Sequence, residues 1–123
     1  MKSRKRILLV EDEMFIAICL EMELKDAGYD VCRRVATGEE AVTAAAAQPP
    51  DVILMDIRLA GEMDGIEAAR QIQTHRDIPI IFMTGYSDAA IEGRAKQLAP
   101  LHYFLKPIEV SMLQPWIDSV ERQ

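Results

Sequence analysis

Five side chains that can take part in chemistry stand directly after apolar runs of this 123-residue chain. They are three acids, one hydroxyl and one amine, namely Glu11, Asp12, Asp56, Thr84 and Lys106. If the apolar runs are neighbouring parallel strands, these side chains converge, because the ligand crevice of an open α/β sheet lies outside the carboxyl ends of its strands. The sequence therefore predicts one site built from residues far apart along the chain.

Three carboxylates at one edge of a sheet repel each other, so at least one takes up a proton unless a cation offsets the charge. Carboxylates from separate strand ends suit Mg²⁺, which favours octahedral oxygen ligands and keeps several waters. The metal and Lys106 together offset the formal charge of Glu11, Asp12 and Asp56. We therefore expect a magnesium site here.

A carboxylate beside both a magnesium ion and a lysine is poised as a nucleophile toward phosphorus, because the two cations neutralise the oxygens of the transferred group. Asp56 is the best candidate, since it ends the most apolar run of the chain, while Glu11 and Asp12 are better placed as metal ligands. The Thr84 hydroxyl can bind a further phosphoryl oxygen. The expected product is an aspartyl phosphate on Asp56.

Five short apolar runs alternate with five helical patterns, without an internal repeat or a linker. The expected strands cover residues 7–10, 31–35, 52–55, 80–83 and 101–105, and the expected helices 14–27, 37–48, 64 to before 79, 87–98 and 111–122. Short strand-helix connections imply right-handed crossovers and a parallel sheet covered on both faces. We predict one doubly wound, three-layer α/β domain over residues 1–123.

Several residues mark the ends and faces of these helices. Thr37, Asp64 and Ser87 are expected N-caps, and Gly28 is expected to end the first helix. Pro115 fits the last helix only close to its start, and otherwise kinks it. The inward face of the first helix is expected to carry Ile16, Leu20, Leu24 and Ala27.

Composition excludes several classes of protein. The 14 basic and 20 acidic residues give a net charge of −6, which argues against direct nucleic-acid binding. No apolar run is long enough to span a bilayer. The apolar stretch after the basic start is interrupted at once by Glu11, Asp12 and Glu13, unlike a signal peptide. Cys19 and Cys32 indicate buried thiols in a reducing compartment rather than a zinc site. A cytoplasmic location is therefore expected.

Four segments together resemble the four motifs of bacterial response regulator receiver domains of the chemotaxis-regulator type. They are Ile7–Glu13, Val52–Ile57, Phe82–Gly85 and Phe104–Pro107. The resemblance covers essentially the whole chain, in order and at suitable spacing. It implies a flavodoxin-like (βα)5 fold whose five parallel strands are ordered 2-1-3-4-5.

The resemblance also implies the reaction. In such receivers the aspartate at the position of Asp56 accepts a phosphoryl group from the phosphohistidine of a sensor histidine kinase or phosphotransfer protein. Thr84 and Lys106 match the phosphoryl-binding pair. Asp12 and Asp56 would bind Mg²⁺ directly and Glu11 through water. The backbone carbonyl of Arg58 would complete the protein ligands.

An aromatic residue three positions before the lysine, here Tyr103, is the family's switch residue. If the resemblance holds, phosphorylation draws Thr84 toward the phosphate and Tyr103 turns into the space left behind. The face of the fourth helix, fifth strand and fifth helix then changes its affinity for a downstream protein partner. The expected protein is a signalling receiver rather than an enzyme, although it promotes its own phosphorylation and dephosphorylation. We expect a monomer or a weak phosphorylation-dependent dimer.

Some alternatives stay open at this point. Arg58 and Tyr86 depart from the commonest pattern of the family. In receivers these two positions flank the path of the water that hydrolyses the phosphate, so the lifetime of the phosphate is undetermined. The turn Thr84-Gly85-Tyr86 resembles single-domain regulators of alphaproteobacteria, and the chain is either such a regulator or a fragment. A degenerate receiver that binds proteins without phosphorylation is the main alternative function.

Two further classes are disfavoured by single positions. A haloacid-dehalogenase-type phosphohydrolase needs a second acid where Arg58 stands. A nucleotide-binding domain needs a glycine-rich loop after the first strand, and Val10-Glu11-Asp12-Glu13 contains no glycine.

Overall fold

The computed structural model describes residues 4–121, and in that range five strands alternate with five helices. The strands are β1 Arg6–Val10, β2 Asp30–Val35, β3 Val52–Asp56, β4 Ile80–Thr84 and β5 His102–Leu105. The helices are α1 Met14–Asp26, α2 Gly38–Ala47, α3 Gly65–Gln73, α4 Ala89–Lys96 and α5 Val110–Ser119. The predicted alternation is confirmed.

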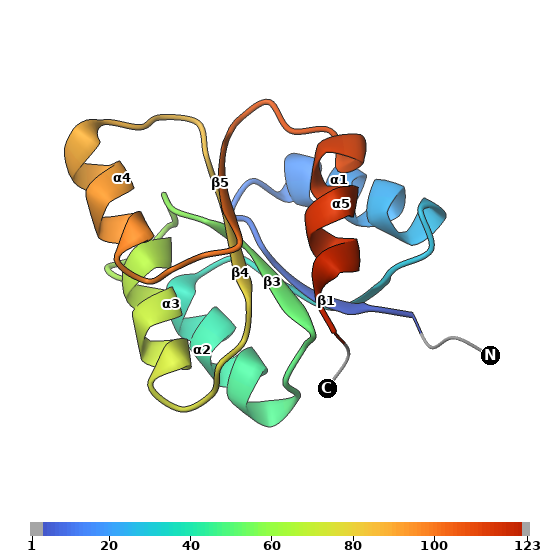
Figure 1. Ribbon diagram of the computed structural model, residues 1–123, viewed down its shortest axis with the longest axis horizontal. Helices are drawn as coiled ribbons and strands as arrows, with labels where there is room; N and C mark the ends of the chain where they lie inside the picture. The colour runs from blue at the N-terminus through green and yellow to red at the C-terminus, as the bar shows by residue number, and fades with distance from the viewer. Residues whose placement is uncertain (1–3, 122–123) are drawn as a thin grey trace.

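The strands form one parallel sheet in the order β2-β1-β3-β4-β5. Figure 1 shows α1 and α5 covering one face of this sheet and α2, α3 and α4 covering the other. The predicted doubly wound, three-layer fold with strand order 2-1-3-4-5 is therefore confirmed. The order reverses between β1 and β3, which makes the carboxyl ends of these two strands the expected place for a ligand.

The central strands β3 and β4 are buried along their whole length. Their side chains alternate between two apolar clusters, because successive residues of a strand point to opposite faces of the sheet. Ile53 and Phe82 belong to the cluster beneath α2, α3 and α4, and Leu54 and Ile81 to the cluster beneath α1 and α5. Burial on both faces explains why these runs are almost wholly apolar. It also gives the polar residues at their ends a rigid support.

Side-chain capping agrees with the sequence at two of three predicted positions. Thr37 and Asp64 each accept a hydrogen bond from the backbone N–H three residues later, and so cap α2 and α3. The predicted Ser87 cap of α4 is wrong, because Asp88 accepts the equivalent bond at 2.9 Å. The Ser87 hydroxyl instead shares a hydrogen bond with the phenol of Tyr103.

The inward face of α1 is rotated relative to the predicted one. Ala17, Leu20 and Leu24 are buried, whereas Ile16 is 39 % exposed and Ala27 is exposed at the C-cap. Spacings of three and four residues from Ala17 make one stripe of the helix, and Ile16 lies beside it. The prediction for Leu20 and Leu24 is confirmed, and that for Ile16 and Ala27 is wrong.

Two other expectations need correction. Cys19 and Cys32 are free thiols, as predicted, but half-buried rather than buried. Pro115 lies inside α5, which begins at Val110. Helix α5 ends at Ser119, and residue 122, where we expected the end, lies outside the described residues.

Within residues 4–121 no helix has the length and apolar character that crossing a bilayer requires.

Candidate functional site

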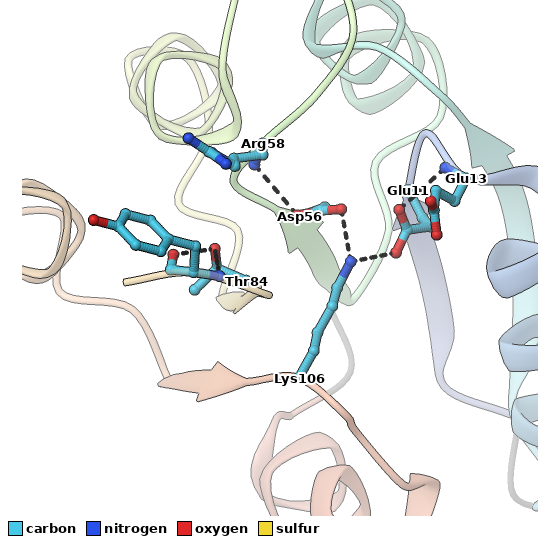
Figure 2. Close-up of polar contacts among 7 residues, drawn as sticks. Glu11, Glu13, Asp56, Arg58, Thr84 and Lys106 are labelled. Atoms are coloured by element: carbon cyan, nitrogen blue, oxygen red, sulfur yellow. Dashed lines mark hydrogen bonds and ion pairs between the residues drawn. The ribbon is translucent and has the colours of Figure 1, made fainter. Parts of the chain in front are cut away.

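The carboxyl ends of the strands bring the predicted site residues together. Asp56 is the last residue of β3 and Glu11 follows the end of β1. These two strands are paired, with Val10 opposite Met55, so Glu11 and Asp56 lie on adjacent strand ends. Lys106 directly follows β5, and its side chain extends back over the sheet edge (Figure 2).

The amine of Lys106 bridges the two buried carboxylates. Its Nζ lies 2.6 Å from Glu11 Oε1 and 2.8 Å from Asp56 Oδ2 (Figure 2). Glu11 is 2 % exposed and Asp56 is 3 % exposed, so the charge of the pair is poorly screened by water. The other Glu11 oxygen accepts the backbone N–H of Glu13 at 3.2 Å. Lys106 is thus the cation that makes this buried pair tolerable.

The two carboxylates have opposite pKa shifts. Burial, together with the neighbouring Glu11 carboxylate, raises the pKa of Asp56 to about 7, although Lys106 opposes the shift. Burial also acts to raise the pKa of Glu11, but hydrogen bonds with Asp56 and Lys106 outweigh it and lower that pKa. For Lys106, burial acts to lower the pKa, but the hydrogen bonds to Asp56 and Glu11 raise it. Near neutral pH, therefore, Asp56 takes up the proton before Glu11 does.

We predict that the Asp56→Asn variant is more stable than the wild type in metal-free solution at pH 8, by about 2 kcal/mol. The folded-state pKa of Asp56, about 7, lies above the unfolded value of about 3.9. Between these values the folded wild type binds more protons than the unfolded chain, so its stability falls as pH rises. Urea unfolding in EDTA should show a difference that is largest above pH 7 and shrinks toward pH 4. A constant difference across this range would contradict the assignment.

The carboxylates of Glu11, Asp12 and Asp56 fit a small divalent cation. One oxygen of each lies within 4.8 Å of the others. All three donors are hard oxygens, and Asp12 is exposed, which leaves one side open to the waters that Mg²⁺ retains. The backbone N–H of Arg58 donates to Asp56 Oδ1 at 3.3 Å. The residues present are therefore suitable for Mg²⁺, and the individual ligand roles, including that of the Arg58 carbonyl, stay predictions.

Thr84 lies at the end of β4 but its hydroxyl is committed to a local turn. The side chain is fully buried, and Oγ1 donates to the carbonyl oxygen of Tyr86 at 2.7 Å. The N–H of Tyr86 donates back to Thr84 Oγ1 at 3.3 Å. The structure thus brings Glu11, Asp56 and Lys106 into contact while Thr84 is engaged elsewhere.

Tyr103, the predicted switch residue, is half-buried on β5, opposite Phe82 of β4. Its phenol shares a hydrogen bond with Ser87 in the loop between β4 and α4. Nothing in the sequence pairs these two residues, because both residue types are common in strands and turns. Their contact ties the predicted switch residue to the loop that follows Thr84.

Gly65 is a site residue that the sequence reasoning missed. A Cβ built on Gly65 would lie 2.0 Å from the carbonyl oxygen of Asp56. The Gly65 N–H also donates to the carbonyl of Ile57 at 2.8 Å. Helix α3 therefore begins in direct contact with the backbone that positions Asp56. The available signal was a glycine at the first helical position, where no turn requires it.

A second missed feature is the contact between Arg58 and Tyr86. The guanidinium carbon of Arg58 lies 5.2 Å from the centre of the Tyr86 ring. Both residues were singled out in the sequence as departures from a pattern, but nothing there placed one on the other.

Comparisons with known proteins agree with this geometry. The family model described as the response regulator receiver domain matches residues 7–118. The transcriptional regulatory protein PdtaR of Mycobacterium tuberculosis is 34 % identical over 114 residues, which cover 93 % of this chain and 55 % of PdtaR. The DNA-binding transcriptional regulator NtrC of Salmonella typhimurium is 37 % identical over 109 residues, which cover 88 % of this chain and 23 % of NtrC. The chain thus spans about half the length, or less, of these relatives.

Solved structures give the same result. The signal receiver domain of a modulated diguanylate cyclase from Desulfovibrio desulfuricans is 36 % identical, with a TM-score of 0.89 over 96 % of this chain and 94 % of that chain. A CheY-like response regulator receiver domain protein from Methanospirillum hungatei is 26 % identical, with a TM-score of 0.86 over 94 % of this chain and 95 % of that one. Sequence and fold therefore point to the same family.

Proposed function

Since the chain belongs to the response regulator receiver domain family, and so to two-component signalling, we propose that it is a switch set by phosphorylation of Asp56. Family membership implies a histidine kinase or phosphotransfer protein as its partner. The observation that supports the proposal most strongly is the Lys106 amine, which bridges the buried Asp56 and Glu11 carboxylates at the strand ends.

In the proposed reaction an Asp56 carboxylate oxygen attacks the phosphorus of a phosphohistidine. The new O–P bond forms as the N–P bond breaks, and the histidine nitrogen keeps the electron pair of that bond. The product is an aspartyl phosphate and a free histidine on the donor. Only ionised Asp56 can attack. Lys106 favours the ionised form by lowering the pKa of Asp56, and its amine is placed to pair with a phosphoryl oxygen.

A magnesium ion held by Asp12, Asp56 and the Arg58 carbonyl, and by Glu11 through water, would neutralise charge on the phosphoryl oxygens. The chain's own residues do the rest of the work. Glu11 keeps Lys106 next to Asp56 while the acceptor is empty. The buried end of β3 fixes the attacking oxygen.

The proposed output is a change in the face formed by α4, β5 and α5. The Thr84 hydroxyl leaves the Tyr86 carbonyl and donates to a phosphoryl oxygen instead. Tyr103 gives up its hydrogen bond with Ser87 and turns into the space that Thr84 leaves. This face then changes its affinity for a downstream protein partner. Although PdtaR and NtrC are named as transcriptional regulators, we propose no direct nucleic-acid contact for this domain, because its net charge is −6.

The free thiols Cys19 and Cys32 support a cytoplasmic location, which we propose together with a monomer or a weak phosphorylation-dependent dimer. The degenerate receiver, which binds partners without phosphorylation, is disfavoured because the chain has the acceptor, the acids, the hydroxyl and the lysine.

Magnesium removal tests the proposal directly. With acetyl phosphate as donor, intact mass spectrometry should show one phosphoryl group per chain in magnesium buffer and none after EDTA treatment. The reason is that Lys106 alone leaves part of the charge of the acids and the phosphoryl group uncompensated. Equal phosphorylation with and without EDTA would contradict the metal role, and no adduct in either buffer would favour the degenerate receiver.

A further inference from the structure

We propose that Arg58 is a positioning residue, whose contact with Tyr86 keeps the Thr84 hydroxyl away from Asp56 until a phosphoryl group on Asp56 attracts the guanidinium. This inference rests on the proposed function and deepens it. It concerns how the unphosphorylated loop is held, and what releases it.

The Thr84 hydroxyl is held by the backbone of Tyr86. Its proton is donated to the Tyr86 carbonyl at 2.7 Å, and its oxygen accepts the Tyr86 N–H at 3.3 Å. The side chain is fully buried, so it has no water to exchange with. To reach a phosphoryl oxygen, the hydroxyl must therefore give up both hydrogen bonds to the Tyr86 backbone.

Tyr86 is in turn held by its contact with Arg58. Tyr86 is 52 % exposed, so burial restrains it only weakly. The guanidinium of Arg58 lies over the ring, 5.2 Å from its centre, in the geometry of a cation–π contact. Arg58 is itself anchored beside the acceptor, since its N–H donates to Asp56 Oδ1. A chain of contacts thus runs from Asp56 through Arg58 and Tyr86 to Thr84, separate from the Lys106 bridge.

Phosphorylation of Asp56 creates a second partner for the Arg58 guanidinium, which competes with the Tyr86 ring. A cation–π contact at an exposed site changes an equilibrium by only about two- to fivefold. A phosphoryl group carries about −1.5 to −2 charges and forms strong charge-assisted hydrogen bonds with arginine. Arg58 is exposed and its backbone is adjacent to the acceptor, so little prevents its side chain from turning. The phosphoryl group therefore displaces the ring as the partner of the guanidinium.

The same loop carries the change onward. Ser87 is next to Tyr86 and shares its hydrogen bond with the Tyr103 phenol. Freeing Tyr86 therefore loosens the segment that restrains Tyr103 as well as the one that restrains Thr84. One contact, between Arg58 and Tyr86, then influences both residues of the proposed switch.

The test compares the unphosphorylated loop in four variants by amide NMR, with the shifts of magnesium–beryllofluoride-treated wild type as the reference for the switched state. Arg58→Gln and Tyr86→Leu both remove the contact, whereas Tyr86→Phe keeps the ring. We expect the ratio of switched to unswitched loop, measured at Gly85 and Ser87, to rise about two- to fivefold in the first two variants and to stay at the wild-type value in the third. The double variant should equal either single variant, because both remove the same contact.

Four outcomes would overturn the inference. They are wild-type shifts in Arg58→Gln, wild-type shifts in Tyr86→Leu, equal effects of Tyr86→Phe and Tyr86→Leu, or additive effects in the double variant. If any of these occurs while wild type responds to beryllofluoride and forms the adduct, only the role of Arg58 fails. If wild type does neither, the proposed function fails and takes this inference with it.

Discussion

Replacing Asp56 with asparagine should abolish the phosphoryl adduct that acetyl phosphate and Mg²⁺ form on the wild-type protein. The amide nitrogen and oxygen of asparagine carry no negative charge with which to attack phosphorus, and the substitution also removes one carboxylate from the metal cluster. Asparagine has nearly the same shape, so packing at the end of β3 is retained. Intact mass spectrometry should show no adduct, a complete loss rather than a slower reaction.

The matched control is Asp26→Asn, which makes the same chemical change at the exposed end of α1. That residue lies at the opposite end of the helix from the site, so the adduct should form at wild-type stoichiometry. The Asp56→Asn protein is expected to be more stable than the wild type even in metal-free solution, so it should be folded in the assay and unfolding does not explain its loss of the adduct. An adduct of wild-type stoichiometry on Asp56→Asn would show that another residue is the acceptor.

The Gly65→Ala variant should lose about 3 kcal/mol of unfolding free energy. The added Cβ would lie 2.0 Å from the carbonyl oxygen of Asp56 and 2.9 Å from Cα of Ile57. Both are backbone atoms, so no side chain can rotate away, and α3 or the end of β3 must shift. Because that shift moves Asp56, phosphorylation should also slow in the fraction that stays folded. Urea unfolding monitored by circular dichroism measures the change in stability.

Gly93→Ala is the matched control for this variant. Gly93 lies within α4, and a Cβ there meets no atom within 4 Å. Alanine is favoured over glycine in a helix, so this variant should gain up to about 1 kcal/mol. Equal stability changes in the two variants would contradict the close approach of α3 to β3.

The arrangement of the sheet could be predicted because the apolar runs and helical patterns of this chain agree with each other at every level. Asp56 ends a strand that is buried on both faces, and the uninterrupted apolar run before Asp56 predicts that burial. Parallel pairing then brings Glu11 and Lys106 to the same edge. The sequence therefore contained the proximity of these three residues, although not the bridge at 2.6 and 2.8 Å.

The missed contacts of Ser87, Arg58 and Tyr86 depend on the path of loops through space. Helix α4 begins one residue later than the Ser87 cap would require, so Asp88 caps it. The Ser87 hydroxyl has a different partner, the phenol of Tyr103. The contact of Arg58 with Tyr86 joins two loops that are separated by a helix and a strand. The secondary-structure propensities of individual residues do not predict contacts between two loops. The proposed subgroup of single-domain regulators likewise stays a prediction.

The most direct test of the account is to locate the phosphoryl group on the chain. After acetyl phosphate and Mg²⁺ treatment, borohydride reduction converts an aspartyl phosphate to homoserine, and peptide mass spectrometry identifies the position. We expect homoserine at position 56, in proportion to the adduct seen by intact mass and absent from samples treated with EDTA. Homoserine at another aspartate, or an adduct that leaves position 56 unreduced, would contradict it.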